Sequence, residues 1–166
     1  MAYQLIHWEA TDANMYQYQY LEAHKTLIIR HTGIFVGAEI FSALENALVD
    51  IGEKGLGYIV VDATYVTAVT MEDSDSARVM AFTYALKKPN IAQTGAAEVI
   101  CVKPVLPDTA ETLMARLKLV LAHTGATELM QSLVWVDSLT AAFALVGDLT
   151  PENIDAGLWV SEISGF

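Results

Sequence analysis

Three short runs of consecutive apolar residues recur along this chain, and segments with the period of a helix separate them. The runs occupy residues 58–61 (YIVV), 99–102 (VICV) and 133–136 (LVWV). Strands that are apolar at every position bury both faces, as the interior strands of parallel sheets do. Parallel neighbours must be joined by crossovers, which are usually helices. This alternation predicts an α/β domain with a largely parallel sheet.

Four segments show the apolar spacing of three and four residues that is typical of an amphipathic helix. Their ends follow the rules for helix termini, because acidic residues open the second helix, cations close it and a proline follows. Asp108 and Ser138 are the expected N-caps of the third and fourth helices. The four predicted helices span residues 37–52, 70–86, 108–124 and 141–146.

The N-terminal part predicts a hairpin. Tyr16, Tyr18 and Tyr20 alternate with glutamines, which indicates a strand with one aromatic face, and residues 26–32 (TLIIRHT) form a second strand close behind it. The predicted order is therefore β-β-α-β-α-β-α-β-α, a mixed, mostly parallel five-stranded sheet with about four helices. We expect three parts: an N-terminal arm (1–14), the α/β domain (15–149) and a C-terminal tail (150–166) that packs on the domain or on a partner.

The charge of the chain excludes several classes of partner. Its net charge is −11 and its pI is about 4.5, so its field repels phosphate backbones and anionic lipid head groups. We therefore expect no nucleic-acid partner. Apolar runs of about 18 residues do not occur, so we also expect no membrane insertion. A single cysteine, Cys101, cannot form an intramolecular disulfide. These features favour a cytoplasmic location.

The sequence contains no pattern of a known catalytic or metal site. Histidines 7, 24, 31 and 123 lack the spacing of metal ligands, and no nucleophile elbow, phosphate loop or dinucleotide fingerprint is present. Cys101 lies inside an apolar run, where its thiol should be buried and inert. We therefore expect a protein without a metal, without a cofactor and without enzymatic activity.

Three stretches resemble the STAS-like (SpoIIAA-like) family of anti-sigma-factor antagonists and its SEC14-like relatives: TLIIRHTG, YIVVDATYVTAVTMEDSDSARVMAF and LVWVDSLTAAFALVG. The resemblance implies the same fold over residues 15–148, with Asp62 as the acid that ends a central strand. The family carries Asp, a phosphorylated Ser and a second Ser where this chain has Thr70, Met71 and Glu72, and Asp73 replaces the glycine of the family. Phosphorylation at the usual position is therefore excluded, and Ser74 lies three residues further on.

Polar and acidic residues gather between positions 70 and 76. This cluster is either a docking loop at the carboxyl end of a strand, where open α/β sheets place their sites, or an ordinary helix start with its cap and acids. From the resemblance, the first functional hypothesis is a regulatory module that binds another protein. Its candidate partner-binding residues are Asp62, Thr70, Met71, Glu72, Asp73 and Ser74.

Two further expectations concern partners. The tyrosine stripe at residues 16–20 is either one packed face of the sheet or the wall of a pocket, so the alternative function is a carrier or sensor of a small apolar ligand or lipid between sheet and helices. Strands that are apolar on both faces also need a cover on the second face. The candidates are the tail, residues 150–166, and a second copy of the chain, and we expect a homodimer.

Overall fold

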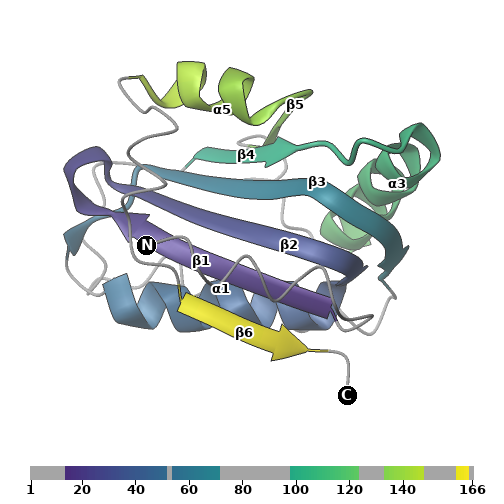
Figure 1. Cartoon of the computed structure of the whole chain (residues 1–166), viewed down its shortest axis with the longest axis horizontal. Helices are drawn as coiled ribbons and strands as arrows, with labels where there is room; N and C mark the ends of the chain where they lie inside the picture. The colour runs from purple at the N-terminus through teal and green to yellow at the C-terminus, as the bar shows by residue number, and fades with distance from the viewer. Residues whose placement is uncertain (1–13, 52–53, 72–97, 124–132, 148–159, 165–166) are drawn as a thin grey trace.

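The computed structural model describes residues 14–51, 54–71, 98–123, 133–147 and 160–164. These residues form one sheet with helices on both of its faces (Figure 1). The chain begins with β1 (Asn14–Leu21), a short 3-10 helix η2 (Glu22–His24) and β2 (Thr26–Val36). The remaining elements are α1 (Gly37–Ile51), β3 (Tyr58–Thr70), β4 (Glu98–Val102), α3 (Pro107–His123), β5 (Leu133–Val136), α5 (Leu139–Val146) and β6 (Val160–Ser164).

The strands form a six-stranded sheet in the order β5-β4-β3-β2-β1-β6. The β1–β2 hairpin is antiparallel, whereas β2, β3, β4 and β5 pair in parallel. Lys25, which connects η2 to β2, adopts the left-handed conformation with a φ of 50° and so lets the chain reverse. The predicted α/β class, with a mixed and mostly parallel sheet, is confirmed.

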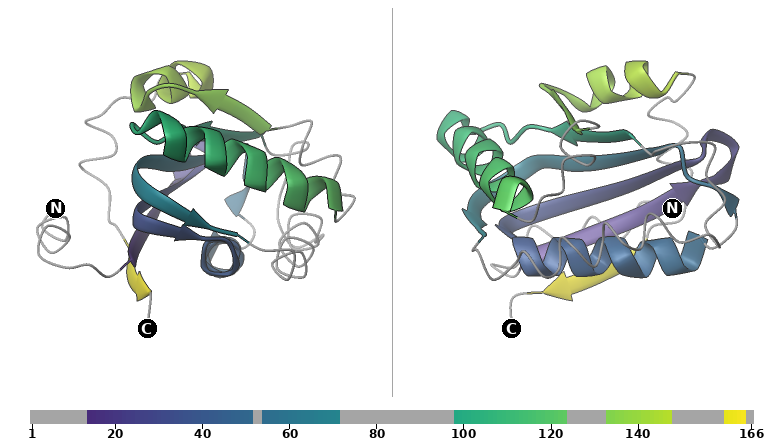
Figure 2. Two further views of the ribbon diagram at one scale, coloured as in Figure 1. Left: turned by 90° about the vertical axis from the view of Figure 1, so that its right-hand side faces the viewer. Right: turned by 180° about the vertical axis from the view of Figure 1, so that it is seen from behind.

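One face of the sheet carries the main core. Helices α1 and α3 pack on this face, as the view from behind in Figure 2 shows. The odd-numbered residues of β2, such as Leu27 and Ile29, point into this core, because side chains alternate along a strand. Tyr16 and Tyr18 are buried in the same core, and the Tyr18 hydroxyl donates to Asp50 Oδ2 of α1 at 2.7 Å. Tyr16 and Tyr18 of the tyrosine stripe are thus packed in the core, and Tyr18 and Tyr20 also line a pocket of about 200 Å³ beside α1.

The second face carries a smaller core. Ala142 and Phe143 of α5 pack there with Ile28, Val60 and Ile100, one residue from each central strand. Helix α5 is capped as predicted, because Ser138 Oγ accepts a hydrogen bond from Ala141 N at 3.1 Å. Since α5 covers this part of the second face, these residues do not require a second copy of the chain. The homodimer itself stays a prediction.

Several predicted boundaries are wrong. Strand β3 does not end at Asp62 but continues to Thr70, because β2 runs alongside it as far as Val36. Helix α3 begins at Pro107, so Asp108 lies in its first turn and is not the N-cap. The tail supplies a sixth strand, β6, which pairs antiparallel with β1. The predicted helix 70–86 falls outside the described residues, apart from Thr70 and Met71.

Candidate functional site

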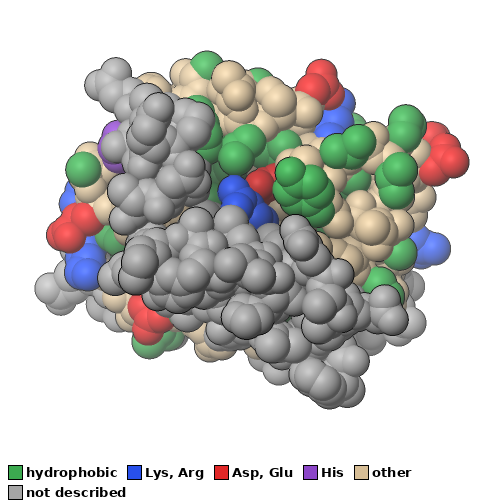
Figure 3. Space-filling view, in the orientation of Figure 1, with side chains coloured by type: hydrophobic (Ala, Val, Ile, Leu, Met, Phe, Trp, Pro, Cys, Tyr) green, Lys and Arg blue, Asp and Glu red, His purple; other side chains and the backbone are tan. Residues whose placement is uncertain are grey.

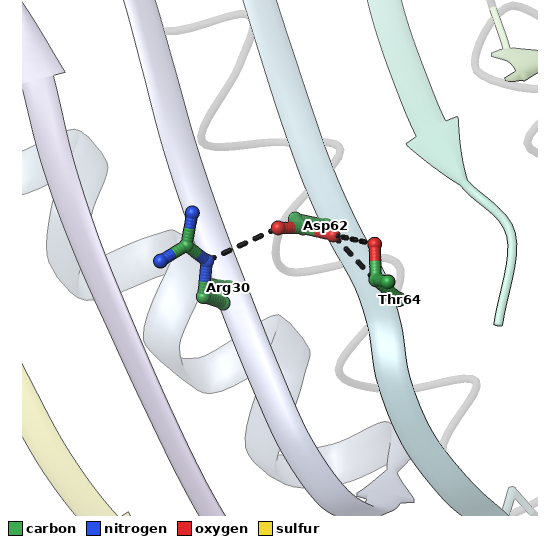
Figure 4. Close-up of polar contacts among 3 residues, drawn as sticks. All are labelled: Arg30, Asp62 and Thr64. Atoms are coloured by element: carbon green, nitrogen blue, oxygen red, sulfur yellow. Dashed lines mark hydrogen bonds and ion pairs between the residues drawn. The ribbon is translucent and has the colours of Figure 1, made fainter. Parts of the chain in front are cut away.

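A buried ion pair lies on the second face of the sheet. Arg30 of β2 and Asp62 of β3 are direct neighbours in the parallel register, and Arg30 Nε donates to Asp62 Oδ2 at 3.1 Å (Figure 4). The Asp62 side chain is 2% exposed and the Arg30 side chain 14% exposed. Two charges this deep are stable only when each has a partner and further hydrogen bonds. Asp62 is therefore held inside the protein and does not form part of an exposed contact.

The other carboxylate oxygen of Asp62 fixes an irregularity in β3. Asp62 Oδ1 accepts hydrogen bonds from the backbone N–H of Thr64, at 3.1 Å, and from the Thr64 hydroxyl. An aspartate that binds the backbone two residues later is a typical turn element. The register shifts at this point, because Asp62 lies opposite Arg30 but Tyr65 lies opposite Thr32. Asp62 thus stabilises a β-bulge, and the bulge turns Tyr65 onto the second face.

Sequence reasoning missed Arg30, although a signal for it exists. The runs TLIIR and YIVVD are each four residues long before a charge, and the charges are opposite. Parallel pairing of Thr26 with Tyr58 brings the two fifth positions side by side. A comparison of the two strands in this register would have identified the ion pair.

Beyond the bulge, apolar side chains are exposed. Tyr65 is 60% exposed, and Ile34 of β2 lies close by, opposite Ala68. The loop after β4 runs along the same strand, since Val105 N donates to Thr64 O at 3.1 Å, and it exposes Val105 and Leu106. Figure 3 shows hydrophobic side chains gathered on this side of the molecule, beside a depression that holds both charge signs. We call Ile34, Tyr65, Val105 and Leu106 the β3 surface.

The structure separates the predicted partner-binding residues. Thr70, the last residue of β3, is exposed, whereas Met71 is buried in the main core. Thr70 lies eight positions after Asp62 along β3, which corresponds to about 26 Å. Glu72, Asp73 and Ser74 lie outside the described residues. The described members of the predicted set therefore do not form one contiguous surface.

Two hollows lie between the sheet and its helices in the described part of the chain: a pocket of about 200 Å³ between the β1–β2 hairpin and α1, lined by Tyr18 and Tyr20, and a smaller cavity between the central strands and helices α1 and α3. The smaller cavity has a volume of about 40 Å³, and its walls include Phe35, Phe41, Val61, Cys101 and Leu121. Ligand pockets usually measure about 300 to 1,000 Å³. The smaller cavity therefore has room for a group of a few atoms. Burial raises the pKa of the Cys101 thiol to about 12, so this wall carries no thiolate.

The main core also contains a buried histidine. His31 is fully buried, its ring stacks on Tyr16 at 5.8 Å between centroids, and its Nε2 donates to Ile34 O at 2.6 Å. Burial lowers the pKa of His31, and the Ile34 carbonyl and the Glu39 carboxylate partly oppose this effect. His31 is thus a neutral core residue at pH 7.

Within the described ranges, no three His, Cys, Asp or Glu side chains gather in a way that could hold a metal ion. None of the helices in the described part of the chain combines the length and the apolar character that a membrane span needs.

No protein-family model matches this chain, and no curated protein matches its sequence. Among solved structures, that of the anti-sigma factor antagonist SpoIIAA in its unphosphorylated form matches 81% of this chain and 99% of its own, with 13% identity and a TM-score of 0.47. At this identity, the likeness concerns the path of the backbone and transfers no residue role to this chain.

Proposed function

We propose that this chain is a non-catalytic regulatory module of the cytoplasm that binds another protein through the β3 surface. The observation that carries the proposal is the exposure of Tyr65, Val105 and Leu106 where the loop after β4 bonds to β3. Contiguous exposed apolar side chains mark interaction sites in soluble proteins. The resemblance of the sequence patterns to the STAS-like family supports a regulatory role.

The β3 surface favours a partner with an apolar contact area and a basic rim. Tyrosine is a common anchor of protein interfaces, because it buries a large ring and keeps a hydroxyl for hydrogen bonding. The chain carries a net charge of −11, so a partner with lysine or arginine around its contact area is attracted at long range. Thr70, at the exposed end of β3, lies at the same end of the sheet and is the described residue of the predicted set that fits this role.

The test compares capture of a partner by three forms of the tagged chain. The wild type should retain a partner from the native cytoplasm, and Tyr65→Arg combined with Leu106→Arg should lose it. Val49→Arg is the matched control, because Val49 is 77% exposed on α1, on the other face of the sheet. The captured protein is then titrated against all three forms by calorimetry. Equal affinity of the double variant and the wild type would overturn the proposal.

The sequence also suggested a carrier or sensor of a small apolar ligand. The cavity between the central strands and the helices has a volume of about 40 Å³, and the pocket that Tyr18 and Tyr20 line beside α1 has about 200 Å³; both are smaller than most ligand pockets. Native mass spectrometry separates the two functions. Val61→Trp fills the cavity. An organic mass that co-purifies with the wild type and is absent from this variant would favour the carrier. The mass of the bare chain in the wild type would favour the interaction module.

A further inference from the structure

An open groove of about 480 Å³ lies between helix α3 and strand β5, away from the β3 surface. In the described sheet, β5 is an edge strand that pairs on one side with β4. Leu133 and Trp135 of β5 form one wall of the groove and are half-buried. A half-buried tryptophan beside an open groove is the kind of anchor that protein interfaces use.

The other wall is a stripe along α3. Glu111, Met114, Ala115 and Lys118 all line the groove, and their spacing of three, four and seven residues places them on one side of the helix. The core-facing residues of α3, such as Leu113 and Leu117, lie on a different side. Helix α3 therefore has one face in the core and a second face that is available to a partner.

The charges on this stripe are arranged symmetrically about its centre. Glu111 and Lys118 stand at the two ends, about 10 Å apart along the helix axis, and the apolar pair Met114 and Ala115 lies midway between them. No ion pair joins Glu111 or Lys118 to another residue in the described part of the chain. A two-fold axis through the midpoint would place Glu111 of one copy opposite Lys118 of the other, twice.

This pattern decides between possible occupants. In a symmetric dimer, the same patch serves both copies and must complement itself. A stripe with an acid at one end, a base at the other and an apolar centre meets this condition when the two helices run antiparallel. Glu111 and Lys118 also cancel in charge, so the patch itself adds no like-charge repulsion between two chains of −11 each.

We infer that a second copy of this chain occupies the groove, with the two α3 helices antiparallel and Glu111 of each copy facing Lys118 of the other. Met114 and Trp135 form the apolar centre of the interface, and the charged residues form its rim. This dimer uses a different set of residues from the proposed partner site.

Charge reversal tests the inference. Light scattering of the wild type at concentrations up to about 100 µM should report twice the 18.1 kDa chain mass. Glu111→Lys or Lys118→Glu alone creates two like-charge contacts in the dimer, and each should raise its Kd about tenfold or more. The double variant restores both contacts with their signs exchanged, so its Kd should return to within about threefold of the wild type.

Cross-linking provides a second, independent readout. Ala115→Cys lies near the expected two-fold axis, so a short bismaleimide should link two copies of this variant. Val49→Cys, which is exposed on α1, should stay unlinked under the same conditions. The native Cys101 is buried and contributes no reactive thiol. A monomeric wild type, a double reversal without recovery, or equal linking through both cysteines would overturn the inference.

Discussion

Arg30 and Asp62 meet at 3.1 Å across two parallel strands, at the last position where β4 still pairs with β3. Beyond this point β3 has β2 as its strand neighbour in the described sheet, and the bulge at Thr64 begins. The ion pair therefore lies at the boundary between the buried part of the second face and the exposed β3 surface. This position explains why a residue that looks functional in the sequence has a structural role.

Asp62→Ala should lower the free energy of unfolding by about 3 to 5 kcal/mol, because it removes one half of a buried ion pair and keeps the Arg30 charge largely buried. Urea unfolding followed by tryptophan fluorescence measures the loss. The double variant Arg30→Met with Asp62→Leu should lose less free energy of unfolding than Asp62→Ala alone, since neither charge of the pair then remains buried. Equal losses for the two variants would show that the pair contributes nothing beyond packing.

Thr64→Val removes the hydroxyl that donates to Asp62 Oδ1 and keeps the β-branched shape. We expect a loss of about 1 kcal/mol in the free energy of unfolding. Thr67→Val is the matched control, because Thr67 lies three residues further along the same strand and is exposed. The control should change the stability little. A larger loss for Thr67→Val than for Thr64→Val would contradict the assigned role of the bulge.

Met71→Ser tests the position that aligns with the phospho-acceptor of the STAS-like family. Met71 is 4% exposed and packs in the main core, so the substitution should cost about 2 to 5 kcal/mol of stability. A buried hydroxyl is also out of reach of a kinase, and a phosphate of nearly −2 charge would repel Glu72 and Asp73. Thr70→Ser, at an exposed position, is the stability control. Stoichiometric phosphate on the folded Met71→Ser chain, detected by mass spectrometry, would count against this reasoning.

The regular parts of the fold follow from the sequence, and the irregular parts do not. The alternation of apolar runs with helical periodicity identified β3, β4 and β5, and the Ser138 cap marked the start of α5. The length of β3 was missed, because Asp62 interrupts the apolar run and was interpreted as its end. The following residues ATYVTAVT are rich in β-branched and aromatic types, which also favour a strand. In the sequence alone, a charged residue after an apolar run looks like the end of a strand. Asp62 stays inside the strand because Arg30 on the neighbouring strand pairs with it.

The candidate sites depended on contacts that no local pattern contains. Tyr65 and Val105 are far apart in the sequence, and they lie close together because Val105 N bonds to Thr64 O. The groove beside β5 needs both the edge position of that strand and the second face of α3. The stripe from Glu111 to Lys118 is visible in the sequence at helical spacing, but a polar flank of that kind usually faces solvent. Only the groove distinguishes it from an ordinary exposed helix face.

The last prediction concerns pH and follows from His31. Burial lowers the pKa of His31 in the folded state below its usual value of 6.5, so the unfolded chain binds the proton more readily than the folded one. The free energy of unfolding should therefore be unaffected by His31 above pH 6.5 and should fall as the pH drops below it, by up to about 1.4 kcal/mol per pH unit. His31→Phe keeps an aromatic ring against Tyr16 and Phe35 but cannot bind a proton. Urea unfolding of both forms at steps between pH 7.5 and pH 5, above the range where carboxylates titrate, should show a steeper loss for the wild type. Parallel curves would mean that His31 titrates alike in the folded and unfolded states, and that its burial in the main core does not control its charge.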